Sequence, residues 1–545
     1  MAGETTGVEI VDAALAGEAA PFAERLVADQ VASKLASQDA TLWGPEAESE
    51  ASIRLSWTTL HKSSRPLIGE IEALRTDLRS EGVDRVVLAG MGGSSLAPEV
   101  ITATDGVALT VLDTTDPGQV ADALAGDLER TVIVVSSKSG GTVETDSHRR
   151  IFAKAFVDAG IDAARRIVVV TDPGSPFAEL SEKEGYRKVF LADPNVGGRY
   201  SALTAFGLVP AGLAGADVAR LLDQAASVAD TLAADSADNP AVKLAAAWVA
   251  AHEKKGAEKL VIATVPSKEG GSVLKGFADW AEQLIAESTG KQGTGLLPVA
   301  VEGPDSPGFA DAKDDATPVA VGRAEGTAKI SVTGSLGAQF LLWEFATALA
   351  GRLLGINPFD QPDVEAAKKA ARSLLDNPDK LKGGEEPSTV DGAVEVFGSA
   401  GVATEGKLAD ILRAFFDSAP ETGYIAVQAY LDRLDDASTS LLRGEIAKRT
   451  GRQTTFGWGP RFLHSTGQYH KGGHQNGVFL QITGAVEQDL DVPDRPYTLG
   501  VLQHAQALGD GQVLAEHGRP VLRLHLTDRA AGLAELVRAV QEAGE

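Results

Sequence analysis

Residues 85–98 read RVVLAGMGGSSLAP, and this stretch decides the fold class of the chain. A short aliphatic, β-branched run passes through a glycine-rich turn into Ala-rich sequence of helical period. The same alternation recurs downstream, where β-branched runs occupy residues 108–114, 131–137, 166–172 and 188–193. Strands that alternate with helices are typical of βαβ units, so the sequence predicts an α/β fold with a parallel sheet flanked by helices.

The rest of the chain extends this pattern into further units. Strand-like runs at 258–264, 296–301, 317–322 and 329–334 predict a second α/β unit, and runs at 424–430, 478–483 and 520–526 predict a smaller C-terminal one. Residues 377–392 are polar and rich in Gly and Pro, which is typical of a linker. We expect a helical N-terminal arm over 1–62, packed on the first sheet, α/β units over 63–215, 216–376 and 393–545, and a linker over 377–392.

Composition excludes several classes of protein. The 545 residues include no cysteine, which rules out disulfides, thiolate metal sites and cysteine nucleophiles. Asp and Glu exceed Lys and Arg by 76 to 50, giving a net charge of −26 that repels nucleic acid and anionic membranes. The sequence contains no long uncharged apolar stretch, and its N-terminus lacks a basic-then-apolar signal pattern. We therefore expect a cytoplasmic protein with no nucleic-acid or membrane partner.

Two segments that each follow a predicted strand, one strand–helix unit apart, are rich in Gly, Ser and Thr. They read GMGGSS at 90–95 and SSKSGGTVET at 136–145. Glycines let the backbone approach a ligand, and a helix start offers unpaired N–H groups to an anion. Each segment alone fits a plain polar turn, but two at one edge of a sheet indicate a phosphate site. The pattern GxxxxGK[ST] is absent, so nucleoside triphosphate chemistry is not expected.

Three later segments carry charged residues in suggestive positions: NVGGRYSALT at 195–204, FADWAEQLIAESTGK at 277–291 and GINPFDQPDVEAAK at 355–368. Arg199 follows the last strand of the first sheet, where a cation can stabilise an oxyanion. Glu287 falls in the last turn of a helix, which favours a role as a base. Lys368 lies early in a new helix. The plain alternatives are a solvated Arg, an exposed Glu near a helix end and a solvated helix face.

In chain order these five segments resemble the phosphoglucose isomerase family, over residues 86–368. The resemblance implies two sugar-isomerase (SIS-type) α/β domains and the interconversion of glucose 6-phosphate and fructose 6-phosphate, a step of glycolysis and gluconeogenesis. It also implies a cis-enediol intermediate, a sugar phosphate as small-molecule partner, a homodimer, and no metal or other cofactor. The region beyond residue 377 is similar to the tail of an actinobacterial-type isomerase.

The resemblance further implies a role for each matching residue. Gly93 and Ser94 would line the sugar site, and the phosphate would be held by Ser137, Lys138, Ser139 and Thr142. Arg199 would stabilise the enediolate, and Glu287 would move a proton between C2 and C1. Gln361 would contact the phosphate end, and Lys368 would assist ring opening. An aldose–ketose interconversion needs such a carboxylate together with positive charge near the developing oxyanion.

One feature departs from the family pattern. Most members carry a catalytic His, given by the neighbouring subunit, between the Glu and the Gln…Lys motif, but none of the nine histidines lies between Glu287 and Gln361. Three histidines cluster later, at His464, His470 and His474. Our hypothesis is that His464 or His470 reaches the sugar ring from the C-terminal unit, within or across subunits. The alternatives are a structural or surface role and, less favoured because glycines interrupt the cluster, a metal site.

Other functions share parts of this pattern. A mannose-phosphate or dual-specificity isomerase differs only in the shape of the sugar pocket. A non-catalytic sugar-phosphate sensor needs the phosphate loops but has no need for Glu287, Arg199 and Lys368 together. A Schiff-base aldolase acting through Lys138 or Lys368 lacks the eightfold barrel pattern.

Overall fold

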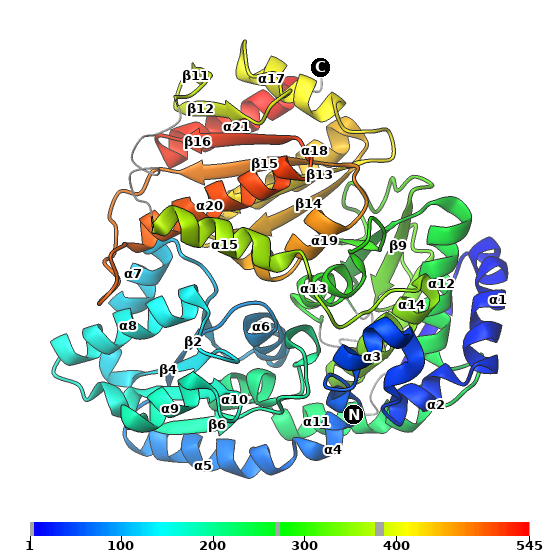
Figure 1. Cartoon of the computed structure of the whole chain (residues 1–545), viewed down its shortest axis with the longest axis horizontal. Helices are drawn as coiled ribbons and strands as arrows, with labels where there is room; N and C mark the ends of the chain where they lie inside the picture. The colour runs from blue at the N-terminus through cyan, green and yellow to red at the C-terminus, as the bar shows by residue number, and fades with distance from the viewer. Residues whose placement is uncertain (1–4, 267–272, 377–385, 544–545) are drawn as a thin grey trace.

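The computed structural model describes residues 5–266, 273–376 and 386–543. Three sheets flanked by helices form a first unit at the lower left of Figure 1, a second at the right and a third at the top. None of the helices in the described ranges is both long enough and apolar enough to cross a lipid bilayer.

The described α-helices divide among the N-terminal arm and the three units. The arm contains α1 (Ala13–Ala28), α2 (Val31–Ala36), α3 (Pro45–Ala51) and α4 (Leu60–Ser63). The first unit contains α5 (Pro66–Ser80), α6 (Gly93–Asp105), α7 (Pro117–Ala125), α8 (Val143–Asp158), α9 (Pro176–Lys183) and α10 (Ala205–Ala214). The second contains α11 (Val218–Leu232), α12 (Pro240–Lys255), α13 (Phe277–Thr289), α14 (Leu336–Leu354) and α15 (Val364–Leu375). The third contains α17 (Leu408–Asp417), α18 (Leu442–Thr450), α19 (Gly467–Gly472), α20 (Leu499–Glu516) and α21 (Arg529–Ala543).

The first sheet is parallel throughout and has the order β3-β2-β4-β5-β6. Its strands are β2 (Arg85–Ala89), β3 (Thr110–Leu112), β4 (Thr131–Ser136), β5 (Ile167–Thr171) and β6 (Lys188–Leu191), so all five predicted runs are confirmed. The chain places β3 on one side of β2 and β4 on the other. Ligands bind at such a reversal of strand order, outside the carboxyl ends of the strands. The loops that follow β2 and β4, both singled out in the sequence, flank this point.

The second sheet has the order β1-β10-β9-β7-β8. Its four predicted runs are confirmed as β7 (Lys259–Thr264), β8 (Leu297–Val301), β9 (Ala316–Val321) and β10 (Ile330–Thr333), which are mutually parallel where they pair. The fifth strand, β1 (Gly7–Ile10), comes from the N-terminal arm and pairs with β10 in the antiparallel sense.

The position of β1 corrects the expectation that the arm is wholly helical and packed on the first sheet. β1 joins the edge of the second sheet, and α1 packs against α12 of the second unit. The physical reason is that β10 presents unpaired N–H and C=O groups, which a short strand can satisfy. Val8 and Ile10 then contact the hydrophobic core from this edge.

The third sheet has six strands, one more than each of the other two, in the order β11-β12-β16-β15-β13-β14. They are β11 (Thr389–Asp391), β12 (Val394–Gly398), β13 (Tyr424–Tyr430), β14 (Gln453–Trp458), β15 (Gly477–Gly484) and β16 (Val521–Leu526). The three predicted runs are confirmed as β13, β15 and β16, whereas β12 and β14 were not predicted. β11 lies in the predicted linker, of which residues 377–385 are outside the described residues.

The three units meet at the centre of the molecule (Figure 1). There α13 of the second unit contacts α6 of the first and α19 of the third, while α15 packs along α20. Arg461 of the third unit forms ion pairs with Glu99 at 2.7 Å and Asp113 at 3.1 Å, both in the first unit. These contacts bring segments from all three units around the loops that follow β2 and β4.

Candidate active site

Glu287 and Arg199 form a buried ion pair at this centre. Arg199 lies in a short 3-10 turn, η5 (Gly198–Tyr200), after β6, and its Nε is 3.1 Å from Oε2 of Glu287 on α13. Only 4% of the Arg199 side chain and 7% of the Glu287 side chain are exposed, so neither is a solvated surface group. The guanidinium also donates to the Pro358 carbonyl at 2.7 Å and to Gln361 Oε1 at 2.9 Å. The structure therefore brings Arg199, Glu287 and Gln361 together.

Gln283 is a member of this group that the sequence reasoning missed. Its Nε2 donates to Glu287 Oε2 at 3.1 Å and to the His464 carbonyl at 2.8 Å. Among the described residues nothing forms a hydrogen bond with the other oxygen of Glu287, Oε1. The signal was present in the sequence, because Gln283 precedes Glu287 by four residues on the same helix and such residues are neighbours on its surface.

His464 lies at the end of a 3-10 turn, η7 (Arg461–His464), in the third unit. Its Nε2 is 3.0 Å from Oε1 of Glu144, which also accepts a hydrogen bond from Gln506 at 2.7 Å. Burial raises the pKa of the Glu144 carboxyl, but the charge and hydrogen bond of His464 outweigh it and lower that pKa to about 2. An ionised carboxylate only accepts hydrogen bonds, so Nε2 is the donor. Nδ1 of His464 makes no hydrogen bond within the described ranges.

The amino-acid sequence alone indicates no role for Glu144, which lies in the segment 136–145. It is the second residue of α8, and an acidic residue in the first turn of a helix commonly does no more than stabilise the helix terminus. Glu144 differs from an ordinary helix-terminus carboxylate only because it contacts His464, which lies 320 positions away in the chain.

The other two histidines of the cluster lie elsewhere. His470 is buried on α19, with Nδ1 3.1 Å from the Tyr424 hydroxyl and its ring against Phe479. Burial lowers the pKa of His470 well below its usual value. His474 Nε2 is 3.2 Å from Nε2 of His252. Of the two candidates, the structure brings His464 and not His470 to the Glu287 group.

The glycine-rich loop after β2 makes room for protein backbone. Gly92 has φ +57°, and a Cβ at this position would lie 2.7 Å from the His464 carbonyl oxygen and 2.8 Å from Gln283 Nε2. A Cβ on Gly93 would lie 1.9 Å from the carbonyl oxygen of Gly198, beside Arg199. Ser94 is half-buried, and its hydroxyl has no hydrogen-bond partner among the described residues. These glycines thus allow the segments that carry Arg199 and His464 to approach each other.

The loop after β4 gathers hydroxyl groups at the start of α8. Ser137 Oγ lies 3.2 Å from Thr142 Oγ1 and accepts the N–H of Gly140 at 3.0 Å, and Ser139 Oγ accepts the N–H of Gly141 at 3.2 Å. Thr142 is the N-cap of α8 but makes no side-chain cap bond, which leaves N–H groups of the first turn available to an anion. The arrangement is therefore suited to bind a phosphate group.

The two lysines predicted for the site, Lys138 and Lys368, both form ion pairs with neighbouring carboxylates. Lys138 forms an ion pair with Asp172 at 2.8 Å and donates to the Val196 carbonyl, so its ammonium group is already partnered. Lys368 pairs with Glu365 at 3.1 Å on the surface of α15. Its charge nevertheless contributes to the low pKa of the Glu144 carboxyl.

Lys291, which the sequence reasoning quoted without a role, supports the turn that carries Gln361. Its Nζ lies 2.6 Å from Asp360 Oδ1 and donates to the Asn357 carbonyl at 2.8 Å. Burial and the charge of Arg199 lower the pKa of Lys291 to about 8, against the attraction of Asp360. The buried ammonium thus fixes the turn beside Arg199.

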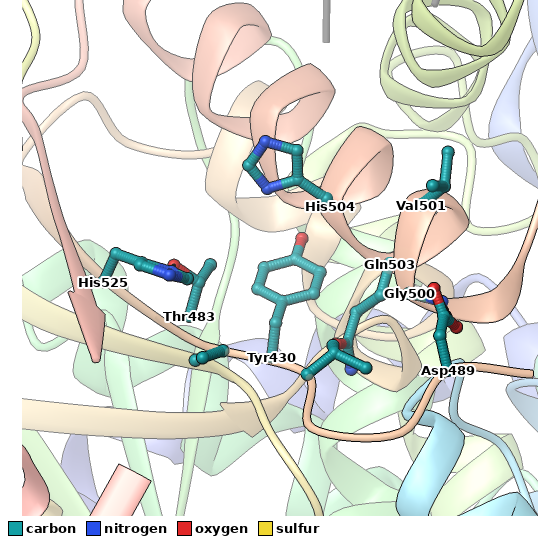
Figure 2. Close-up of a pocket in the computed structure, with 11 residues that line it drawn as sticks. Tyr430, Thr483, Asp489, Gly500, Val501, Gln503, His504 and His525 are labelled. Carbon is teal, nitrogen blue, oxygen red and sulfur yellow. Dashed lines mark hydrogen bonds between the residues drawn. The ribbon is translucent and has the colours of Figure 1, made fainter. Parts of the chain in front are cut away.

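A separate cavity of about 350 Å³ lies in the third unit, at the carboxyl ends of β13 and β15 beside the start of α20 (Figure 2). Tyr430, Thr483, His504 and His525 are among the residues that line it. None of the residues predicted for the active site lines this cavity, so it is distinct from the Glu287 group.

Comparison with known proteins agrees with the motifs. The family model described as "Phosphoglucose isomerase" matches residues 65–296. A Haloarcula marismortui protein named "Probable glucose-6-phosphate isomerase" is 30% identical in an alignment 423 residues long, which covers 67% of this chain and 93% of that relative. A Cyanothece sp. protein named "Glucose-6-phosphate isomerase" is 34% identical over 238 residues, which are 41% of this chain and 42% of that relative, so this match spans less than half of it.

A similar architecture exists among solved structures. The crystal structure of a glucose-6-phosphate isomerase from Chlamydia trachomatis matches with a TM-score of 0.53 at 18% identity, over 67% of this chain and 86% of that one. At this identity the likeness shows a shared fold alone. The family model and the alignment along nearly the whole Haloarcula protein carry the assignment further: the chain belongs to the phosphoglucose isomerase family.

Proposed function

We propose that the chain catalyses the reversible isomerisation of glucose 6-phosphate and fructose 6-phosphate through a cis-enediol, with Glu287 as the base. The observation that carries the proposal is the asymmetric environment of the Glu287 carboxylate. Arg199 and Gln283 both bind Oε2, while Oε1 makes no hydrogen bond within the described ranges. One oxygen thus orients the side chain and the other is available to a substrate.

The proton transfer uses that available oxygen. Oε1 takes the proton from C2 of the open-chain aldose and returns it to C1, while the proton of the O2 hydroxyl passes to O1, so that the aldose becomes the ketose without a net change of atoms. Negative charge develops on the oxygens of the enediol during this step, and the Arg199 guanidinium supplies fixed positive charge beside it. Burial of the pair keeps solvent from weakening that interaction.

Phosphate binding provides orientation at a distance from the reacting carbons. Ser137, Ser139 and Thr142, with the first turn of α8, form the phosphate site. Binding energy from this remote group holds C1 and C2 against Glu287, which lowers the entropy cost of reaching the transition state.

We assign the opening of the sugar ring to His464. Glu144 accepts the hydrogen bond of Nε2–H and orients the imidazole, so that Nδ1 can take the proton of the O1 hydroxyl and pass it to the ring oxygen O5 as the C1–O5 bond breaks. Lys368 adds positive charge nearby. Because His464 belongs to the same chain as Glu287, the site gains its histidine without a second subunit. The homodimer remains a prediction from the family resemblance.

Replacement of Glu287 tests the proposal. Glu287→Gln keeps the size of the side chain but removes the base, so turnover of fructose 6-phosphate is expected to fall by at least about 100-fold. Formation of glucose 6-phosphate is followed by coupled NADP reduction, and binding of the sugar phosphate is measured by calorimetry. The control is Glu253→Gln, an exposed residue of α12. Near-normal turnover by Glu287→Gln would exclude this mechanism.

The two histidines provide a second, independent test. His464→Ala is expected to lower kcat by about 100-fold or more, because the ring-opening group is lost. His470→Ala should leave kcat within about threefold of wild type and instead lower the free energy of unfolding, because it opens a cavity beside Tyr424. Equal kcat values for wild type and His464→Ala would remove His464 from the mechanism.

A further inference from the structure

Three aspartates converge where the first unit meets the third, outside the Glu287 group. Asp122 lies on α7, and Asp432 and Asp435 lie in the loop that follows β13. One carboxylate oxygen from each residue lies within 4.8 Å of one from each of the other two. Asp122 and Asp435 are exposed at the rim, whereas Asp432 is buried beneath them.

Asp432 leaves one buried oxygen without a partner. Only 2% of the residue is exposed, and Oδ1 accepts the N–H groups of Leu434 at 2.8 Å and Asp435 at 3.2 Å. Oδ2 is buried and has no hydrogen-bond partner among the described residues. A Cβ built on Gly118 would lie 3.3 Å from this Oδ2. Gly118 and Asp122 are one turn apart on α7, so Oδ2 is aimed at the face that carries Asp122.

Among the described residues, no basic side chain serves as a counterion for these three carboxylates. Arg529 pairs with two neighbouring aspartates, Asp116 at 2.8 Å and Asp436 at 3.0 Å. No ion pair to Asp122, Asp432 or Asp435 occurs in the described part of the chain. Three carboxylate oxygens within 4.8 Å of one another repel each other. A cation at this place would relieve both the repulsion and the unpartnered oxygen.

We propose that Asp122, Asp432 and Asp435 bind one Ca²⁺ ion. Carboxylate oxygens are hard ligands. Ca²⁺ binds six to eight oxygen atoms in a flexible geometry, and water can supply those that the protein does not. Mg²⁺ demands a nearly ideal octahedron, which a helix and a loop from different units do not provide as readily. The ion would join α7 of the first unit to the β13 loop of the third and stabilise their contact.

Calorimetric titration of the EDTA-treated, dialysed enzyme with CaCl₂ at pH 7.5 tests the proposal. We expect one site with a Kd on the order of 0.1–1 mM, as for carboxylate sites of modest charge. Asp122→Asn should weaken binding at least about tenfold, because one charged ligand is lost. This variant is chosen because Asp122 is exposed and makes no side-chain hydrogen bond within the described residues, so the fold is not disturbed. Glu487→Gln, an exposed residue of the third unit, is the control and should bind as wild type does.

Several outcomes would overturn the assignment. They are the absence of Ca²⁺ binding by the wild-type enzyme, equal affinity of wild type and Asp122→Asn, and tighter binding of Mg²⁺ than of Ca²⁺. Thermal unfolding gives a second readout, because 10 mM Ca²⁺, at least roughly tenfold above the expected Kd, should raise the Tm of wild type and of Glu487→Gln more than that of Asp122→Asn. Isomerase activity plays no part in this test, so its result is independent of the proposed reaction.

Discussion

At the scale of single residues, Gln283 acts as a positioning residue: it contacts the catalytic carboxylate and not the substrate. Gln283 binds the Glu287 oxygen that Arg199 also binds, and its second N–H reaches the His464 carbonyl. One amide nitrogen therefore links the base to the backbone of the third unit. Gln283 touches no reacting atom in the proposed mechanism, so its effect passes through Glu287.

Replacement of Gln283 should alter the base without removing it. In Gln283→Leu the carboxylate loses a donor, and a hydrogen bond to a charged group contributes about 1.5–3 kcal/mol. We expect kcat to fall about tenfold or more, with a smaller change in KM, because the Glu287 carboxylate is oriented less firmly. Steady-state kinetics measure both constants. An unchanged kcat would show that Gln283 serves packing alone.

At the scale of elements, α6 has a glycine at each end, and the two glycines perform different tasks. Gly92 is the N-cap and Gly106 the C-cap, and both have positive φ, +57° and +69°. A Cβ on Gly106 would meet no atom within 4 Å, whereas one on Gly92 would meet the His464 backbone. The C-cap thus needs glycine only for its conformation, whereas the N-cap also needs the space.

A matched pair of substitutions separates the two requirements. Gly106→Ala should lower the free energy of unfolding by about 1 kcal/mol, the cost of a left-handed conformation for an L side chain. Gly92→Ala should cost more and should also lower kcat, because the Cβ displaces the carbonyl of His464. Urea unfolding and steady-state kinetics of both variants provide the comparison. If kcat fell equally in both, the close approach at Gly92 would have no catalytic importance.

At the scale of the whole molecule, the third unit completes the site built by the first two. Its segment 461–464 carries both the ion pairs to Glu99 and Asp113 and the imidazole that meets Glu144. The docking of this unit therefore positions His464. The same docking buries α20, whose Gln506 bonds to Glu144 from the other side.

Buried histidines should make the folded molecule sensitive to acid. Burial lowers the pKa values of His148 and His504 to about 4, from 6.5. As the pH falls below 6.5 the unfolded chain binds these protons before the folded chain does, so the free energy of unfolding should fall by up to about 1.4 kcal/mol per pH unit for each imidazole until about pH 4. Urea unfolding at pH 7, 6 and 5 measures this slope.

One variant tests the attribution to these histidines. His148→Gln can still donate to the Thr114 carbonyl but does not titrate, so its stability should depend less on pH than that of wild type. His517→Gln, at an exposed position, is the control and should keep the wild-type slope. A wild-type slope in His148→Gln would place the acid sensitivity elsewhere.

The amino-acid sequence by itself determined where along the chain the five strands of the first sheet and four of the five strands of the second lie, and the position of the two loops that flank the switch point. Hydrophobic periodicity and glycine-rich turns are local properties, and the rule that ligands bind at the carboxyl ends of parallel strands connects them to a site. Glu287, Arg199 and Gln361 could be named from segments that the chain spells out. The contacts among these three residues became visible only in the folded structure.

Only the tertiary structure decided which histidine joins the site, which carboxylate holds it, and where the N-terminal arm packs. The sequence offers both His464 and His470 as candidates, yet His464 contacts Glu144 whereas His470 is buried against Tyr424. These contacts join residues separated by 320 and 46 positions. Local sequence spacing cannot predict such long-range contacts. They form only when separate units pack together, which buries the side chains and pairs their polar groups.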